Sequence, residues 1–315
     1  MRTIYGAVLL TLTLGVFARE SVAQDRPAIG APRRLIVHAD DIGISRSVNR
    51  AAFAAAENGA VSSLSVMVPA LAFDDAAQWL RTHPAVDVGV HLTLTCEWPG
   101  RRWGPVLPRE MVPSLVEVDG SFHRRWDPQR VNPAEAEQEL RAQILLARAA
   151  GLHVTHLDVH QFVLFGSGAV FSGVLTRIAR DERLPVLLAR HGPPGIEHVS
   201  AELPGWPVLA QVTTIGAAET PARWARWYET ALRTLPPGTS ELIVHPGYDD
   251  ADLRDVTGDL IGWGAAWRQR DLDVLLGPEF RRLLDERGIR LISWRELAIT
   301  VPESPPEPRV PPPGR

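Results

Sequence analysis

Two adjacent carboxylates, Asp40 and Asp41, follow an apolar segment that begins at Leu35. Two neighbouring buried anions repel each other unless a cation or a shared proton offsets their charge. A metal ion is the natural cation for such a pair, and histidines that could complete its ligand set stand at His91 and His160. The residue types therefore predict a metal centre assembled from three distant segments.

The candidate metal ligands are Asp41, His91 and His160. One carboxylate and two imidazoles leave positions on a divalent metal free for water and substrate, and the metal would lower the pKa of that water. Asp40 belongs to the same turn but points elsewhere, so it could take the proton from the water. Capping of the following helix would also explain the acidic pair, but it leaves the histidines unexplained.

Other polar residues at strand ends are candidates for the remaining roles. Residues 156–160 alternate polar and apolar side chains, so His156, Asp158 and His160 share one strand face. All three cannot ligate one ion from that face without distortion. We therefore assign His160 to the metal and Asp158 to orienting it or a neighbouring group. His245 ends another apolar strand and suits a general acid, although a histidine that merely closes a strand is the alternative.

A long insertion, residues 95–131, contains three of the ten tryptophans, Trp98, Trp103 and Trp126. Structureless connections of that length are uncommon in compact domains, which favours a functional loop. We expect exposed indole faces that stack on sugar rings, with burial in the core as the alternative. The single cysteine, Cys96, cannot form an internal disulfide and is expected to be a small buried residue.

Segments with strand character alternate with segments of helical period along the chain. The predicted strands cover residues 35–38, 61–68, 86–94, 153–158, 184–188, 206–212, 241–245 and 289–293. Such alternation is typical of a parallel sheet, either open and doubly wound or closed into a barrel. Both architectures place functional sites at the carboxyl ends of strands, where the candidate residues stand.

The N-terminal residues have the pattern of a signal peptide. A basic start, an apolar run over residues 4–17 and small residues at Ser21 and Ala23 predict cleavage after Ala23. A retained membrane anchor is the alternative, although the run is short for a span. We expect an exported protein, periplasmic or secreted. The predicted segments are the signal peptide (1–23), a linker (24–33), one domain with the insertion (34–300) and a proline-rich disordered tail (301–315).

The composition is that of an ordinary globular protein, with 45% hydrophobic and 22% charged residues. The formal charge of −4 becomes one unit more negative when residues 1–23 are removed. No basic patch with interleaved aromatic residues is present, which argues against nucleic acid as a partner. We expect no membrane span after leader removal, and the sequence is compatible with a homodimer without fixing the oligomeric state.

At these residues the chain resembles the YdjC-like carbohydrate deacetylases, which are distantly related to the NodB-type polysaccharide deacetylases. The resemblance extends from about residue 35 to residue 297 and depends on several short segments taken together. These are Ala39-Asp-Asp-Ile-Gly-Ile-Ser45 with Asn49, Gly59–Met67, Gly89-Val-His-Leu92, Thr155–His160, His245-Pro-Gly247, Arg268–Leu275 and Arg287–Arg295.

The resemblance implies an irregular (β/α) barrel that removes the acetyl group from N-acetylated amino sugars of a glycan or oligosaccharide. It implies a divalent metal, magnesium or zinc. The roles it assigns are metal ligation by Asp41, His91 and His160, general base for Asp40, general acid for His245, and support of the ligands or contact with substrate for Asp158, Arg268, Trp98 and Trp103.

Two features depart from the family pattern. The family often continues its third motif with further histidines, whereas residues 161–165 here are Gln-Phe-Val-Leu-Phe, which changes the expected substrate contacts. The leader and the insertion favour an exported enzyme that acts on envelope or environmental glycans over cytosolic catabolism of chitobiose.

Two other functions fit parts of the pattern. A non-haem iron oxygenase uses the same ligand types, but we would expect it to be all-β. A catalytically silent glycan-binding protein is the second alternative, and the presence of all the candidate catalytic residues argues against it.

Overall fold

The computed structural model describes residues 32–302, so the predicted signal peptide and nearly all of the predicted linker and tail lie outside the described residues. Every strand pairing among the described residues is parallel, in the order β4-β3-β2-β1-β6-β5, with β7 beside the start of β1. The strands are β1 (Arg33–Ile42), β2 (Ser63–Val66), β3 (Val88–Leu92), β4 (Val154–Val159), β5 (Gln211–Thr214), β6 (Gly238–Val244) and β7 (Ile289–Leu291). The predicted parallel α/β class is confirmed.

The two edge strands, β4 and β5, are connected through the segment 185–191. Leu157 N in β4 donates to Pro185 O at 2.8 Å, and Leu209 N, just before β5, donates to Leu188 O at 2.8 Å. These bonds close the sheet into an irregular barrel.

Two predicted strands differ from the structure. Residues 184–188 form only an isolated bridge, and the strand predicted at 206–212 begins later, at Gln211. Both segments lie where the ring closes irregularly, so tertiary pairing sets their backbone more than local pattern does.

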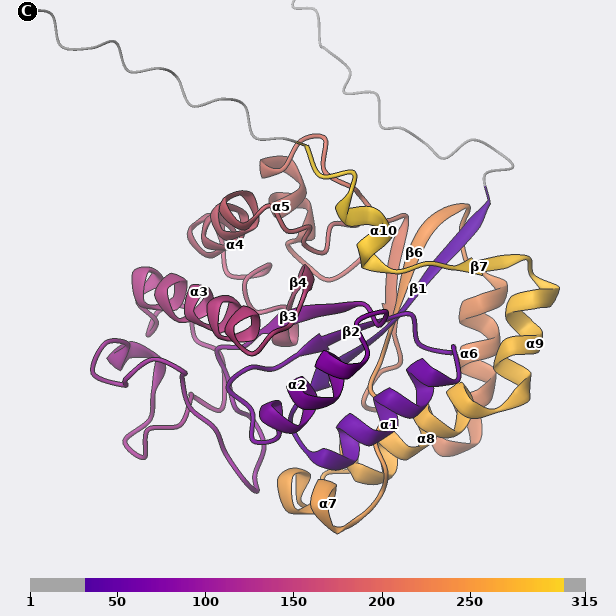
Figure 1. The fold of residues 1–315 in the computed structure, drawn as a ribbon, viewed down its shortest axis with the longest axis horizontal. Coiled ribbons are helices and arrows are strands. Elements are labelled where there is room, and N and C mark those ends of the chain that lie inside the picture. Colours follow the sequence, from indigo (N-terminus) through magenta and orange to yellow (C-terminus); the bar gives the residue numbers. More distant parts are fainter. Residues whose placement is uncertain (1–31, 303–315) are drawn as a thin grey trace, which may run out of the picture.

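The helices surround the sheet (Figure 1), and α1 and α3 contact its strands directly. They are α1 (Arg46–Glu57), α2 (Phe73–Thr82), α3 (Pro133–Ala149), α4 (Ala169–Glu182), α5 (Ile196–Glu202), α6 (Trp224–Arg233), α7 (Ala251–Thr257), α8 (Ala265–Leu276), α9 (Pro278–Glu286) and α10 (Trp294–Ala298), with 3₁₀ turns η1 (Pro113–Leu115), η2 (His160–Phe162) and η3 (Pro221–Arg223). Within residues 32–302, none of these helices combines the length and apolar character that crossing a bilayer requires.

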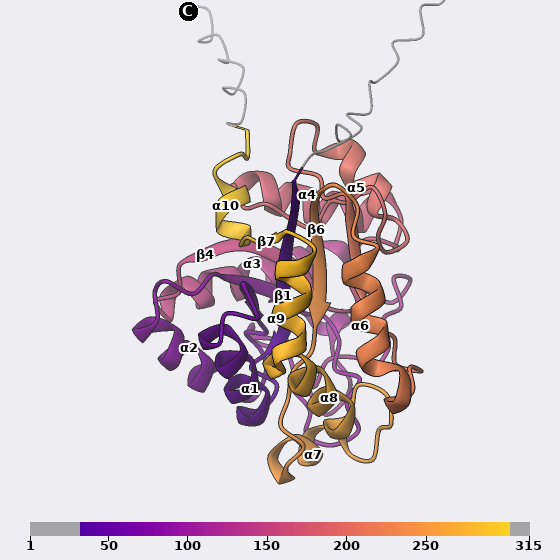
Figure 2. The same ribbon diagram turned by 90° about the vertical axis from the view of Figure 1, so that its right-hand side faces the viewer.

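The candidate residues gather at the carboxyl ends of the strands. Asp40 and Asp41 lie near the end of β1, His91 lies in β3, and His160 and His245 directly follow β4 and β6. Figure 2 shows β1 and β6 side by side, pointing toward the end of the molecule that carries α7 and α8. Parallel pairing thus brings five distant positions to one end of the sheet.

The insertion, residues 95–131, has a small core of its own. Val112, Leu115 and Phe122 are buried, and Val116 pairs with Phe122 in an isolated antiparallel bridge. Ordering so long a segment costs conformational entropy, which only buried apolar surface can offset.

The tryptophans of the insertion serve that packing. Trp98 and Trp103 are only 2% and 4% exposed, so the expectation of exposed indole faces is wrong for both. Trp126 is half-buried, and its Nε1 donates to Ser167 Oγ at 2.6 Å. Cys96 is buried, as expected.

Gly89 in β3 leaves room for a buried histidine ring. A Cβ at this position would lie 2.5 Å from Nε2 of His156, whose ring stacks on Trp294 in the interior. We expect Gly89→Ala to lower the free energy of unfolding by about 1–3 kcal/mol, the usual cost of overpacking. Urea unfolding measures this.

The matched control is Gly173→Ala in α4, where the new Cβ would lie 3.4 Å from the flexible end of Arg177. This control should leave stability unchanged or raise it by up to about 1 kcal/mol, because alanine favours helix over glycine. Equal unfolding midpoints for Gly89→Ala and the parent chain would contradict the packing account.

Candidate metal centre

Three ligand atoms from β1, β3 and η2 converge on one point. Asp41 Oδ1 lies 3.5 Å from His91 Nε2 and 3.3 Å from His160 Nδ1, and the two nitrogens are 3.2 Å apart. Atoms bound about 2.0–2.2 Å from one ion are separated by roughly 3.0–3.5 Å. All three residues are buried, so their mutual spacing fits a divalent metal in a sheltered position.

The backbone of β1 directs its two carboxylates apart. Asp41 has φ 61°, in the left-handed region that few residues other than glycine adopt. Gly43 follows with φ 108°, and its N–H donates to Asn49 Oδ1 at 2.8 Å, which ties the turn to α1. Strained backbone of this kind is typical of functional sites. As a result, Asp41 faces the imidazoles while Asp40 faces His245.

The outer nitrogen of each candidate ligand histidine is held by a carboxylate. His91 Nδ1 donates to Asp158 Oδ2 at 2.7 Å, and His160 Nε2 lies 3.0 Å from both carboxylate oxygens of Glu97. Such partners fix the ring orientation and turn the other nitrogen toward the metal position. Asp158 thus orients His91, the neighbouring group, whereas Glu97 from the insertion orients His160 and was not identified from the sequence.

Arg268, from α8, holds the second oxygen of Asp41. Its Nη2 donates to Asp41 Oδ2 at 2.5 Å, its Nε donates to Trp263 O at 2.9 Å, and its guanidinium lies over the Trp98 ring. Arg268 Nη1 has no hydrogen-bond partner among the described residues, although it is buried. Arg268 therefore orients one ligand and keeps a donor available beside it. Trp103, in contrast, does not line this site.

The candidate base and acid contact each other. His245 Nε2 lies 3.0 Å from Asp40 Oδ1. The His245 ring packs edge-on against Trp263 and Trp267, with ring centroids 4.7 and 5.6 Å away. Its backbone N–H donates to Asp271 Oδ2 at 2.9 Å, which anchors the end of β6 to α8. Proton exchange between Asp40 and His245 is therefore geometrically direct.

A cavity of about 290 Å³, here called the central cavity, opens over these groups. Its lining residues include the three candidate ligands, Asp40, His245, Glu97, Trp98, Gln161, Phe162, Trp263 and Arg268. Gln161 and Phe162 both have φ 54°, and Trp263 has φ 64°, so three further non-glycine residues adopt the left-handed conformation around the cavity. Its volume suits a small ligand or one unit of a larger one.

The charges of the cluster are arranged to hold a cation or protons. Burial opposes ionisation of Asp41, but the Arg268 guanidinium and the two histidines lower the pKa of this carboxyl well below its usual range. Burial likewise opposes the charged form of His91, yet Asp158 and Asp41 raise the pKa of its imidazole to about 10. Without a metal, the carboxylates thus retain protons on the ligand imidazoles, and a divalent cation would take their place.

The third polar residue of the 156–160 segment does not reach the cavity. His156 is buried beside Trp294, and burial lowers the pKa of its imidazole to about 3, so it stays neutral. Alternation along the strand therefore placed Asp158 and His156 on one face, but only the residues nearest the carboxyl end contribute to the site.

Comparison with known proteins gives matches over most of the chain. The family model described as YdjC-like protein matches residues 34–286. A carbohydrate deacetylase of Geobacillus stearothermophilus is 32% identical, with 84% of this chain and 98% of that protein covered, and one of Brevibacillus brevis is 31% identical, with 84% and 99% covered. A crystal structure from Enterococcus faecalis, whose name assigns it to cellobiose-phosphate cleavage, is 27% identical with a TM-score of 0.70, and covers 85% of this chain and 99% of its own.

Proposed function

The chain belongs to the YdjC-like protein family, and from this membership we propose that it is a metal-dependent carbohydrate deacetylase, which hydrolyses the acetamide of an N-acetylated amino sugar. The observation that carries the proposal is the meeting of Asp41, His91 and His160 within 3.5 Å of one another, beside the Asp40–His245 pair. A carboxylate with two oriented imidazoles, next to a proton-exchanging pair, is a site built for hydrolysis.

Asp41, His91 and His160 would hold the metal. When bound, a divalent cation supplies polarisation of the acetamide carbonyl and acidifies a water molecule. Two imidazoles and one carboxylate favour zinc over magnesium, which prefers oxygen ligands. Asp158, Glu97 and Arg268 keep the three ligand side chains in position before any ion arrives.

Asp40 and His245 move the protons. Asp40 accepts a proton from the attacking water as its oxygen adds to the acetyl carbon. His245 Nε2 then delivers a proton to the sugar nitrogen as the C–N bond breaks, which yields acetate and the free amine. Since the two groups lie 3.0 Å apart, the proton taken from water can pass directly to the group that supplies it to the amine.

The test is acetate release from a panel of acetylated amino sugars, after removal of metals with a chelator and restoration of zinc or magnesium singly. We expect acetate to appear only in restored samples. Turnover at the full rate in chelated protein, or no acetate from any sugar with any metal, would reject the proposal. The parallel α/β fold disfavours the oxygenase alternative, and oxygen uptake with bound iron would be the result that supports it.

Glu97→Gln is expected to weaken metal binding by about 10–100-fold, because the amide no longer draws the Nε2 proton of His160 or fixes its ring as a carboxylate does. Calorimetric titration of chelated protein with zinc measures this. The matched control is Glu110→Gln in the same insertion, whose carboxylate is exposed and pairs with Arg109. Equal affinities for both variants would remove Glu97 from the metal centre.

We also propose that the protein is exported and acts on envelope or environmental glycans. The support is the pattern of residues 1–23 alone, which lie outside the described residues. N-terminal sequencing of the protein recovered from outside the cytoplasm should begin at Gln24.

A further inference from the structure

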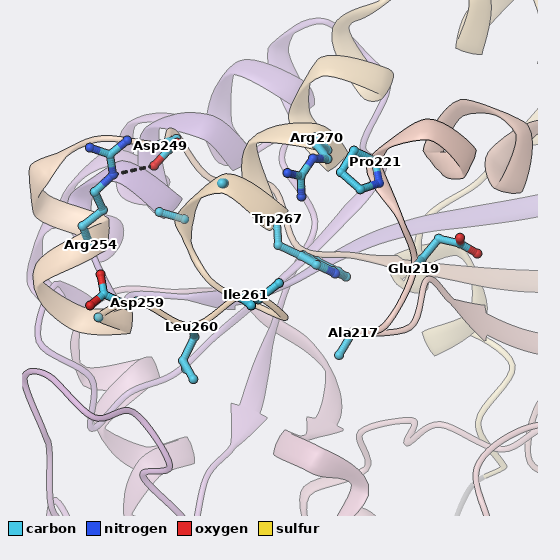
Figure 3. A pocket seen from close by; sticks show the side chains of 13 residues that line it. Ala217, Glu219, Pro221, Asp249, Arg254, Asp259, Leu260, Ile261, Trp267 and Arg270 are labelled. Atoms are coloured by element: carbon cyan, nitrogen blue, oxygen red, sulfur yellow. Dashed lines mark hydrogen bonds and ion pairs between the residues drawn. The ribbon is translucent and has the colours of Figure 1, made fainter.

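A second cavity, here called the side cavity, adjoins the central one (Figure 3). Its volume is about 360 Å³, slightly more than that of the central cavity. Its walls come from the segments that follow β5 and β6, from Ala217 to Pro221 and from Asp249 to Arg270. Such segments at the carboxyl ends of parallel strands form the substrate-binding face of this class of fold.

Only a thin partition separates the two cavities. Leu260 lines both of them. Trp267, in the wall of the side cavity, packs with its ring centroid 4.4 Å from that of Trp263 and 5.6 Å from that of His245, and both of these line the central cavity. Leu260 is 43% exposed, so one extended molecule can occupy both cavities by crossing it.

The side cavity contains a buried donor without a partner. Trp267 is 1% exposed, and its Nε1 has no hydrogen-bond partner among residues 32–302. Figure 3 shows its indole with Arg270 and Pro221 on one side and Ile261 on the other. A buried N–H left unpaired costs free energy, and a ligand acceptor would recover that cost.

The remaining lining suits a neutral, hydroxyl-rich ring. Arg270 lies over the Trp224 face, and Arg254 pairs with Asp249 at 2.8 Å, while Glu219 and Asp259 contribute carboxylates to the same walls. An anionic ligand would meet these carboxylates, and a cationic ligand would meet the guanidinium groups. Sugar hydroxyls can bond to both kinds of group, and the C–H face of a pyranose packs on aromatic and aliphatic side chains.

We propose that the side cavity binds the sugar unit next to the one that is deacetylated, so that the protein selects substrates of at least two linked units. The inference rests on the proposed deacetylase function. The acetylated unit occupies the central cavity, the linkage crosses Leu260, and a hydroxyl of the neighbouring unit accepts from Trp267 Nε1.

Binding measured apart from turnover tests this. In calorimetry with the full chain after chelation, di-N-acetylchitobiose should bind at least about tenfold more tightly than N-acetylglucosamine. Ala266→Trp fills the side cavity from an exposed position of α8, so it should reduce the disaccharide affinity to that of the monosaccharide and leave the monosaccharide affinity unchanged. The matched control, Ala149→Trp at the exposed end of α3, should keep the tenfold preference.

A second variant guards against misfolding of the first. Arg270→Ala removes a side-cavity donor and should lower only the disaccharide affinity, by several-fold. Equal affinities for the two sugars, no binding of either, or parallel loss of both in Ala266→Trp and Arg270→Ala would overturn the inference. Acetate release is followed in parallel: a retained chain-length preference with no release under any metal would reject the deacetylase proposal and leave the sugar subsite standing.

Discussion

Asp41→Asn protein is expected to retain no stoichiometric metal after dialysis and to release no acetate above background. Asparagine tolerates the left-handed backbone at this position, and its amide oxygen can still accept from Arg268, so the turn should keep its shape. The variant lacks the negative charge that balances the cation. Because loss of an outer partner alone costs about 10–100-fold in metal affinity, loss of a ligand charge should cost at least 100-fold.

Metal content by elemental analysis and zinc titration by calorimetry measure this effect. His160→Ala should give the same loss from a position outside the β1 turn. Asp127→Asn, a carboxylate in the insertion that does not line the central cavity, serves as the control and should bind metal as the parent chain does. Stoichiometric zinc in folded Asp41→Asn protein would exclude Asp41 as a ligand.

The elements that place these ligands could be predicted because local pattern and tertiary structure agree there. Apolar runs before Asp40, His91 and His245 are buried strands, and parallel strands in a ring must end on the same face. Position in the chain relative to strand ends was therefore enough to bring the candidate residues together. It could not give the side-chain directions, which depend on the left-handed backbone at Asp41.

The partners of these residues were harder to predict, since they come from segments with no strand pattern. Glu97 is one carboxylate among many in the sequence, and only the folded insertion carries it to His160. Asp271 and Trp263 belong to α8 and the turn before it, a helix that the periodicity did not indicate because it is buried on several sides. For Asp271, the adjoining Arg268 segment was the available signal.

The tryptophans show the same limit from the opposite direction. A chain position inside a long insertion predicted exposure for Trp98 and Trp103, but the insertion buries both because it needs them to become ordered. The aromatic ring that does border the central cavity with partial exposure is Trp263, held at φ 64°. Composition of a loop thus says little about which rings face the ligand.

Asp40→Asn is expected to bind zinc as the parent chain does and to lower kcat for acetate release by about 10²–10⁴-fold, the usual contribution of a general base. The amide occupies the same volume and keeps contact with His245 Nε2, so binding of metal and substrate should persist. Steady-state kinetics with zinc titration separates these effects. Loss of zinc from folded Asp40→Asn protein would contradict the separation between base and ligand.

The contact between Asp40 and His245 makes a stronger claim testable. If one proton passes from water through Asp40 to His245 and on to the sugar nitrogen, the two residues act as a unit. Removing either then interrupts the same transfer, and the Asp40→Asn, His245→Gln double variant should lose little more activity than the worse single variant. Independent roles on separate protons would instead make the two losses multiply, which would place the acid's proton supply elsewhere than Asp40.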